Sequence, residues 1–197
     1  MVIGVTGSLG SGKTAVSKMF GRLGAYVINA DNVCHSLMEP GKKIYKEIVR
    51  HFGKSILMKN QAIDRKRLAG IVFKDDSKRK LLNRLVHPEA IRHIKKILKK
   101  RKGLVVIDAA LLIESGFYKS IDKLIVVKAN RDRQIRRLAG QKAMTRKEIL
   151  RIFKAQSSLK KKLGFADYVI DNNGSKKQTL LQVEKIWKQL GVGYGRK

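Results

Sequence analysis

The sequence predicts a three-layer α/β/α fold, in which helices cover both faces of a central parallel sheet. Three features predict it: five short runs rich in β-branched residues, helical periodicity between most of them, and a glycine-rich turn directly after the first run. Parallel strands need a crossover connection between them, usually a helix, and strands buried on both faces are nearly continuous apolar runs. The length of 197 residues fits a single domain over 1–197 that carries an insert.

The opening segment predicts a strand, a turn, a helix and a second strand. Residues 2–6, VIGVT, are the first expected strand. A helix that ends before Gly24 is predicted next by apolar residues at helical spacing: Ala15, Met19, Phe20 and Leu23. A second apolar run at 26–28 leads into Asn29 and Asp31. A carboxylate placed after a strand can cap a helix, bind a metal or accept a proton, and local sequence leaves these alternatives open.

The segment from about 34 to 102 predicts a helical insert between the second and third strands. Asp64 is the expected N-cap of one helix, and Asp76 or Ser77 is the expected N-cap of the next. Pro88 is expected in the first turn of a further helix, where its missing N–H and its fixed φ are tolerated.

The strand pattern resumes after this insert. GLVVID at 103–108 and KLIVVKA at 123–129 predict two central strands, and ADYVID at 166–171 predicts the last. Between the strands at 123–129 and 166–171, the sequence predicts an arginine-rich helix from 131. A second helix follows it, with a capping box that pairs Thr145 with Glu148.

The composition points to anionic partners and an unexported protein. The formal net charge is +30, and such a field attracts nucleotides, nucleic acids or anionic lipids. No apolar run approaches the roughly 20 residues that span a bilayer. Cys34 is the only cysteine, so an internal disulfide is excluded and the cytoplasm is the expected location. Packing is the expected role of Cys34, and a reactive thiol is the alternative.

The motif that carries chemistry is GSLGSGKT at 7–14, which matches G-x-x-x-x-G-K-[ST] between a predicted strand and a predicted helix. Its backbone N–H groups are expected to converge on phosphate oxygens. Lys13 is expected to reach the β and γ phosphates of ATP, and the Thr14 hydroxyl to bind Mg²⁺. The fold is therefore predicted to be that of a P-loop NTPase, with a nucleotide site formed by Gly10, Ser11, Gly12, Lys13, Thr14 and Ala15.

Other features select among P-loop enzymes. The N-K-x-D string typical of GTPases is missing from the sequence. Helices inserted after the second strand and a basic segment after the fourth match the plan of a small kinase. In that plan the insert binds the acceptor, and the segment from about 131 to 163 is a helical lid over the phosphates.

Four further segments resemble the dephospho-CoA kinase family. INADNVCHSLMEPG at 28–41 is similar to the stretch around its DAD motif, and LVHPEAIR at 85–92 to its LLHP segment. DAALLIESGFY at 108–118 is similar to its PLLFE segment, and AQ at 155–156 followed by ADYVIDNNGS at 166–175 to its closing strand and turn. With the phosphate loop, these blocks cover nearly the whole chain.

The resemblance implies transfer of the γ-phosphoryl group of ATP to the 3′-hydroxyl of dephospho-CoA, the last step of coenzyme A synthesis. It implies that Asp31 is the base, while Asp108 either holds Mg²⁺ or caps a helix. His87 is expected either to face the acceptor or to cap the helix at Pro88, and Glu114 either to act in the site or to pair with a lysine. A monomer with ATP and dephospho-CoA as partners is expected, without a membrane or a specific nucleic acid, although an oligomer stays open.

The sequence also departs from the family pattern. Asn29 replaces the first Asp of DAD, Ala110 replaces the Pro of PLLFE, and Gln141 replaces a lid arginine. Arg137 is therefore the first choice for a catalytic phosphate contact and Arg133, on the same helical face, the second. The rival functions are a nucleoside or nucleoside monophosphate kinase and a basic nucleic-acid-binding ATPase.

Overall fold

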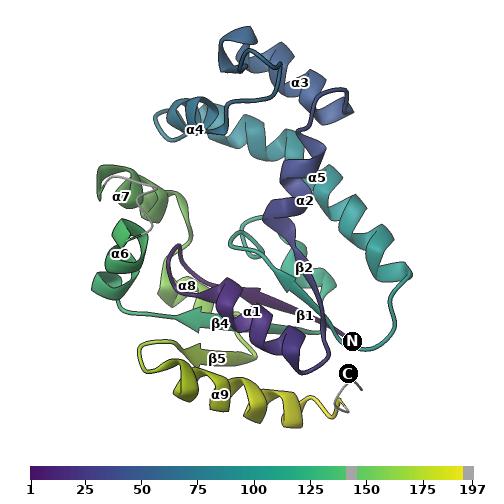
Figure 1. Cartoon of the computed structure of the whole chain (residues 1–197), viewed down its shortest axis with the longest axis vertical. Coiled ribbons are helices and arrows are strands. Elements are labelled where there is room, and N and C mark those ends of the chain that lie inside the picture. The colour runs from purple at the N-terminus through teal and green to yellow at the C-terminus, as the bar shows by residue number, and fades with distance from the viewer. Residues whose placement is uncertain (141–145, 193–197) are drawn as a thin grey trace. The chain divides into compact units, whose positions relative to one another are not determined.

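The computed structural model describes residues 1–140 and 146–192. The chain divides into two compact units, which Figure 1 shows with their elements labelled. We call Met1–Asn29 with Lys100–Lys197 the sheet unit, and Ala30–Lys99 the helical unit. The helical unit begins four residues before the start of about 34 that the sequence predicts for the insert.

The sheet unit contains a five-stranded sheet in the order β2-β3-β1-β4-β5, and every pairing is parallel. The predicted α/β class and all five predicted strands are confirmed. The strands are β1 (Val2–Thr6), β2 (Tyr26–Asn29), β3 (Val105–Asp108), β4 (Lys123–Lys128) and β5 (Tyr168–Asp171). Because β1 is central, its carboxyl end lies between those of β3 and β4.

One face of the sheet packs against α1 (Lys13–Arg22) and α9 (Lys176–Gln189). Alternate strand residues such as Ile3 and Val5 share this core with Phe20 of α1 and Trp187 of α9. The rings of Phe20 and Trp187 lie 6.4 Å apart between centroids. This core fixes the axis of α1, and with it the end of the phosphate loop that runs into the helix.

The opposite face of the sheet packs against the segment that follows β3. Gly4 of β1 has no side chain there, and a Cβ atom would crowd Leu112 and Leu124. The segment ends in the 3-10 helix η2 (Phe117–Ser120), whose Phe117 is buried, and α8 (Leu159–Leu163) contacts β4. Helical and turn segments therefore cover both faces, as the three-layer prediction requires.

Two further helices precede α8 in the region predicted as a lid: α6 (Arg131–Gly140) and α7 (Arg146–Ala155). The predicted capping box at Thr145 and the family departure at Gln141 lie outside the described residues. A Ser158 side chain caps α8 by accepting from the Lys161 N–H at 3.2 Å.

The helical unit consists of α2 (Ala30–Leu37), α3 (Lys43–Phe52), η1 (Lys54–Ile56), α4 (Arg65–Val72) and α5 (Asp76–Lys99). Its core joins Ile48 of α3, Ile56 of η1, Leu68 of α4 and Val86 of α5. The predicted cap of α4 is confirmed, since Asp64 accepts from the N–H groups at positions 66 and 67.

Two predictions for this unit are wrong. The cap of α5 is Asp75, whose carboxylate accepts from the Ser77 and Lys78 N–H groups, because the helix begins one residue earlier than the sequence favours. Pro88 does not begin a helix either. It lies inside the single α5 helix, where buried Val86, Ala90 and Ile94 continue at four-residue spacing and hold the helix together across the missing hydrogen bond.

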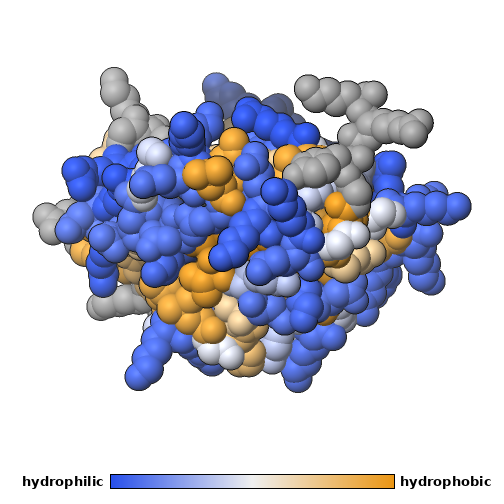
Figure 2. Space-filling view, turned by 90° about the horizontal axis from the view of Figure 1, so that it is seen from below, coloured by the Kyte–Doolittle hydropathy of each residue, from blue (hydrophilic) through white to orange (hydrophobic). Residues whose placement is uncertain are grey.

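The surface agrees with the basic composition. Figure 2 shows a face that is mostly hydrophilic, with apolar side chains confined to smaller areas between polar ones. Among the described residues, the helices are all too short or too polar to cross a bilayer.

Candidate active site

The phosphate loop, residues 7–14, connects β1 to α1, as the motif predicts. Gly12 is the N-cap of α1 and has a φ of 92°, and Gly10 has a φ of 74°, a conformation that favours glycine at both positions. A Cβ atom on Gly12 would also clash with the side-chain amide of Asn172. The loop therefore needs glycine at position 12 both for its backbone angle and for this contact.

Asn172, which follows β5, supports the phosphate loop by a hydrogen bond to its backbone. This residue was not identified from the sequence. Its Nδ2 donates to the Ser11 carbonyl at 2.7 Å, while its Oδ1 accepts from the Thr179 hydroxyl at 3.0 Å. All three side chains are buried, with Asn172 only 8% exposed. A buried amide with both ends bonded fixes the loop backbone before any ligand binds.

Arg137 holds the same loop from the α6 side. Its guanidinium donates to the carbonyls of Gly10 at 3.3 Å, Ser11 at 3.1 Å and Asn172 at 3.0 Å. Burial, followed by the charge of Arg133, lowers the pKa of Arg137 below its usual value, and the group stays cationic. Arg133 donates to the Gly174 carbonyl at 2.8 Å. Of the two predicted phosphate contacts, Arg137 is thus the one beside the loop.

A cavity of about 550 Å³, which we call the donor cavity, opens on the loop. It brings together most of the predicted nucleotide residues with Arg137 and the β5–α9 turn, and Ser11 is buried beneath it. The lining residues are Leu9, Gly10, Gly12, Lys13, Thr14, Ala15, Met19, Arg137, Leu138, Asn172, Gly174 and Lys176. Lys13 and Thr14 stand in the first turn of α1, where backbone N–H groups and the helix dipole favour anions.

Asp108 ends β3 and is only 1% exposed. In the sheet register it is the partner of Val5 in β1 and of Asn29 in β2, and its Oδ2 accepts from Asn29 Nδ2 at 3.3 Å. The alternative that Asp108 caps a helix is wrong, because the residues after it form turns. Its carboxylate thus ends the strand next to β1, which leads into the loop.

Asp31 lies in the first turn of α2 and is exposed. It lines a cavity of about 250 Å³ within the helical unit, together with Cys34, His35, Met38, Leu82, Asn83, Val86 and His87. Since His87 lies in the middle of α5, the alternative that it caps a helix is wrong. Among the described residues, no group of three or more His, Cys, Asp or Glu side chains is arranged to hold a metal.

Two other groups in this cavity are held uncharged. Burial, followed by the Asp31 charge, raises the pKa of the Cys34 thiol to about 11, which fits the predicted packing role. Burial and then Arg65 lower the pKa of His35 below its usual 6.5. Arg65 Nη1 lies 2.8 Å from His35 Nδ1, and because a guanidinium can only donate, Nδ1 accepts and the imidazole is neutral.

Glu114 pairs with a lysine, which was one of its two expected roles. Lys162 is fully buried, and its Nζ donates to Glu114 Oε1 at 2.9 Å and to the Ala110 carbonyl at 2.9 Å. Burial raises the pKa of Glu114, but hydrogen bonds from Lys162 and the Ser157 N–H outweigh it, so the net shift is downward. The pair ties the segment after β3 to α8.

Comparisons with known proteins decide the family. A profile described as dephospho-CoA kinase matches residues 1–178. The chain belongs to the dephospho-CoA kinase family. It is 43% identical to a dephospho-CoA kinase of Aquifex aeolicus over 190 residues, which cover 95% of this chain and 96% of that protein. The family that the sequence motifs resemble is therefore confirmed.

Solved structures agree with membership of the dephospho-CoA kinase family. A dephospho-CoA kinase from Campylobacter jejuni superposes with a TM-score of 0.68 at 25% identity, covering 96% of each chain. The structure of TT1252 from Thermus thermophilus superposes with a TM-score of 0.84 at 26% identity, covering 98% of each chain.

The structure shows which contacts Ala110 makes at the position where the dephospho-CoA kinase pattern has proline. At position 110, where the family resemblance predicts proline, the alanine carbonyl accepts from both Lys162 Nζ and the Thr6 hydroxyl, the latter at 3.2 Å. These bonds use only the backbone oxygen, which proline also provides, so the replacement leaves the contact intact.

Gln156 also contacts the phosphate loop, which the sequence did not predict. The residue belongs to the AQ pair that resembles the dephospho-CoA kinase family, but the resemblance does not indicate its contact. Gln156 Oε1 accepts from the Leu9 N–H at 3.0 Å, across 147 residues of chain. Phe153 of α7 is only partly buried, whereas Ile149 and Ile152 form the buried side of the same helix. A segment that resembles a known family can contain a residue such as Gln156, but only the three-dimensional structure shows what that residue contacts.

Proposed function

We propose that this protein transfers the γ-phosphoryl group of ATP to the 3′-hydroxyl of dephospho-CoA, producing coenzyme A and ADP. The observation that carries the proposal is the family match over residues 1–178, which includes both the phosphate loop and Asp31. In the reaction the hydroxyl oxygen bonds to the γ-phosphorus, the bond from that phosphorus to the β,γ-bridging oxygen breaks, and the hydroxyl proton moves to a base.

The donor cavity supplies the groups that phosphoryl transfer requires. Backbone N–H groups at the start of α1 bind the phosphates of ATP, and Lys13 bridges its β and γ phosphates. Arg137 lines the same cavity and braces the loop carbonyls, so it holds the loop in shape and adds positive charge next to the transferring group.

The available donors fit a magnesium ion. Mg²⁺ prefers oxygen ligands, keeps several waters and is held by one or two protein groups plus substrate phosphates. The Thr14 hydroxyl in the first turn of α1 and the Asp108 carboxylate at the end of β3 are donors of this kind in the sheet unit. When bound, the ion neutralises charge that develops on the phosphate oxygens.

Asp31 is the proposed base. It follows the end of β2 by two residues, it is a carboxylate, and it shares a cavity with side chains that are uncharged at neutral pH. Its neighbour in the motif, Asn29, is neutral and cannot accept the proton. The base chemistry of this stretch therefore rests on one carboxylate.

The test is an assay of the purified protein with ATP, Mg²⁺ and a panel of acceptors. The expected result is conversion of dephospho-CoA to coenzyme A, identified by mass, with AMP and nucleosides left unmodified. Phosphorylation of AMP or a nucleoside and not of dephospho-CoA would contradict the proposal, and so would ATP hydrolysis that only DNA or RNA stimulates.

We further propose that the protein acts as a monomer in the cytoplasm. Cys34 is the only cysteine of the sequence and is free, which fits a reducing compartment, and both substrates are small molecules. Light scattering after size-exclusion chromatography tests the first point, for which the expected mass is 22.3 kDa.

A further inference from the structure

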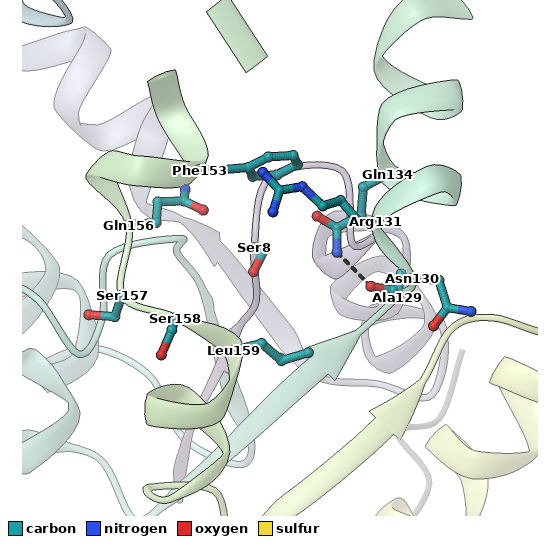
Figure 3. A pocket seen from close by; sticks show the side chains of 10 residues that line it. All are labelled: Ser8, Ala129, Asn130, Arg131, Gln134, Phe153, Gln156, Ser157, Ser158 and Leu159. Carbon is teal, nitrogen blue, oxygen red and sulfur yellow. Dashed lines mark hydrogen bonds between the residues drawn. The ribbon is translucent and has the colours of Figure 1, made fainter. Parts of the chain in front are cut away.

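A second cavity lies beside the phosphate loop in the sheet unit, and the roles described so far do not use it. Its volume is about 450 Å³, within the range of small-molecule sites. Figure 3 shows its lining residues: Ser8, Ala129, Asn130, Arg131, Gln134, Phe153, Gln156, Ser157, Ser158 and Leu159. We call it the lid cavity, because most of these residues belong to the region predicted as a lid.

The lid cavity and the donor cavity share the phosphate loop as a wall. The loop contributes Ser8 to the lid cavity, and the donor cavity begins at the next residue, Leu9. The Leu9 N–H is bonded to Gln156 of the lid cavity at 3.0 Å. Because Lys13 and Thr14 line the donor cavity, ATP is assigned there. A ligand in the lid cavity lies against Ser8, near the start of the same loop.

The lining of the lid cavity suits a flat, uncharged ring with polar edges. None of its residues is acidic, and its one charged group is Arg131. The Arg131 guanidinium lies over the Phe153 ring, 5.1 Å from its centroid, and Figure 3 shows the two groups next to each other. Side-chain amides and hydroxyls, which both donate and accept hydrogen bonds, complete the wall.

We propose that the lid cavity binds the adenine ring of dephospho-CoA, which packs against Phe153 and Arg131. The assignment rests on the proposed function. The reacting 3′-hydroxyl belongs to the same ribose that carries this adenine, so the adenine must lie about one sugar's width from the γ-phosphate of the ATP that the loop binds. Aromatic and guanidinium groups are the side chains on which bases stack. The pantetheine arm leaves from the other end of the nucleotide and is not bound here.

The test compares two phenylalanine variants of the full-length enzyme. Phe153→Leu removes the ring and keeps most of the apolar volume, while Phe165→Leu makes the same change outside the cavity, at a ring that packs at a tilt against Tyr118. We expect Phe153→Leu to raise KM for dephospho-CoA about 10-fold, as loss of one stacked base implies, with KM for ATP unchanged. Phe153→Tyr keeps the ring and should restore the wild-type KM, and Phe165→Leu should not change it.

Inhibition at saturating ATP shows which part of the acceptor is held. AMP carries the adenine and 4′-phosphopantetheine carries the other end, and both should compete with dephospho-CoA in the wild type. Phe153→Leu should weaken inhibition by AMP about 10-fold and leave inhibition by 4′-phosphopantetheine unchanged.

The outcomes separate this assignment from the proposed function. An active wild type whose Phe153→Leu variant matches Phe165→Leu would overturn the cavity assignment alone. So would a rise in KM for ATP, because the cavity would then serve the donor, or an equal weakening of both inhibitors. A wild type that leaves dephospho-CoA unmodified contradicts the proposed function itself.

Discussion

The two units hold their polar groups in different ways. Around the phosphate loop in the sheet unit, Asn172 is 8% exposed and Asp108 is 1% exposed, and both are hydrogen-bonded within the unit. In the helical unit, the proposed base Asp31 is exposed in the first turn of α2. One unit has its polar groups fixed by the fold, and the other leaves them in contact with water.

The difference matches the proposed division of work between donor and acceptor. A loop that must bind phosphates in one geometry gains from groups that are already oriented, because no reorganisation is needed when charge develops. A carboxylate that must take a proton from a bound hydroxyl needs only to be accessible and ionised. The predictions below test this contrast by changing one unit at a time.

The largest effect is expected at Lys13. Lys13→Ala removes the cation proposed to bridge the β and γ phosphates, and kcat should fall about 10³-fold or more, as for loss of a group that stabilises developing charge. Steady-state kinetics measure it, and Lys18→Ala, an exposed lysine of the same helix, is the control with activity near the wild type. Activity of Lys13→Ala close to that of the control would rule out the phosphate-loop assignment.

The next effect is expected at Asp31. Asp31→Asn keeps the shape of the side chain but cannot take a proton, so kcat should fall about 10²- to 10³-fold. ATP affinity, measured by calorimetry, should not change, because the proposed donor groups lie in the sheet unit. Glu39→Gln neutralises another exposed carboxylate of the helical unit and should have little effect. A rate for Asp31→Asn within a few-fold of the wild type would show that Asp31 is not the base.

Stability should respond most at the buried ion pair. Glu114→Gln leaves the fully buried Lys162 without its counter-charge, and the free energy of unfolding should fall by about 3 kcal/mol. Asp76→Asn breaks a pair with Arg79 in which the aspartate side chain is 75% exposed, and the cost should stay below about 1 kcal/mol. Urea unfolding measures the free energy of unfolding of both variants. Equal losses in Glu114→Gln and Asp76→Asn would contradict the prediction that the buried pair contributes more.

The same pair has a pH signature. The folded state lowers the pKa of Glu114 from 4.5, so the unfolded chain binds the proton more readily. The stabilisation is therefore complete above about pH 4.5 and is lost as pH falls through the lower folded value. Glu114→Gln should lack this part of the acid-induced loss of stability.

A smaller effect is expected at Asn172. Asn172→Ala removes the donor to the Ser11 carbonyl, so the loop loses a buried support and KM for ATP should rise about 10-fold. Thr179→Val removes only the hydroxyl behind that amide, and KM should change less than about 3-fold. If both variants keep the wild-type KM, the loop holds its shape without this network.

The strands could be predicted from sequence, because their signal is local. Each is a short β-branched run that ends at a polar residue or glycine, and burial on both faces keeps the run free of charges. The phosphate loop could be predicted for the same reason, since its spacing determines its geometry without help from distant residues.

Other features could not be predicted from local rules. Pro88 favours a helix start, but Val86 is buried in the core of the helical unit and Ala90 is buried one turn later, so α5 continues through the proline. The supports of the loop depend on contacts across 147 residues for Gln156 and 161 residues for Asn172, which one sequence does not reveal. The motif thus predicted the residues that are proposed to face the nucleotide, but not the residues that hold the loop in place.

The hydrogen bond from Leu9 to Gln156 joins the walls of the two cavities. A ligand that shifts the loop in either cavity must also shift a wall of the other. Binding free energies then obey reciprocity: the factor by which ATP changes the affinity for the acceptor is the factor by which the acceptor changes the affinity for ATP. The order in which the two substrates arrive cannot alter that factor.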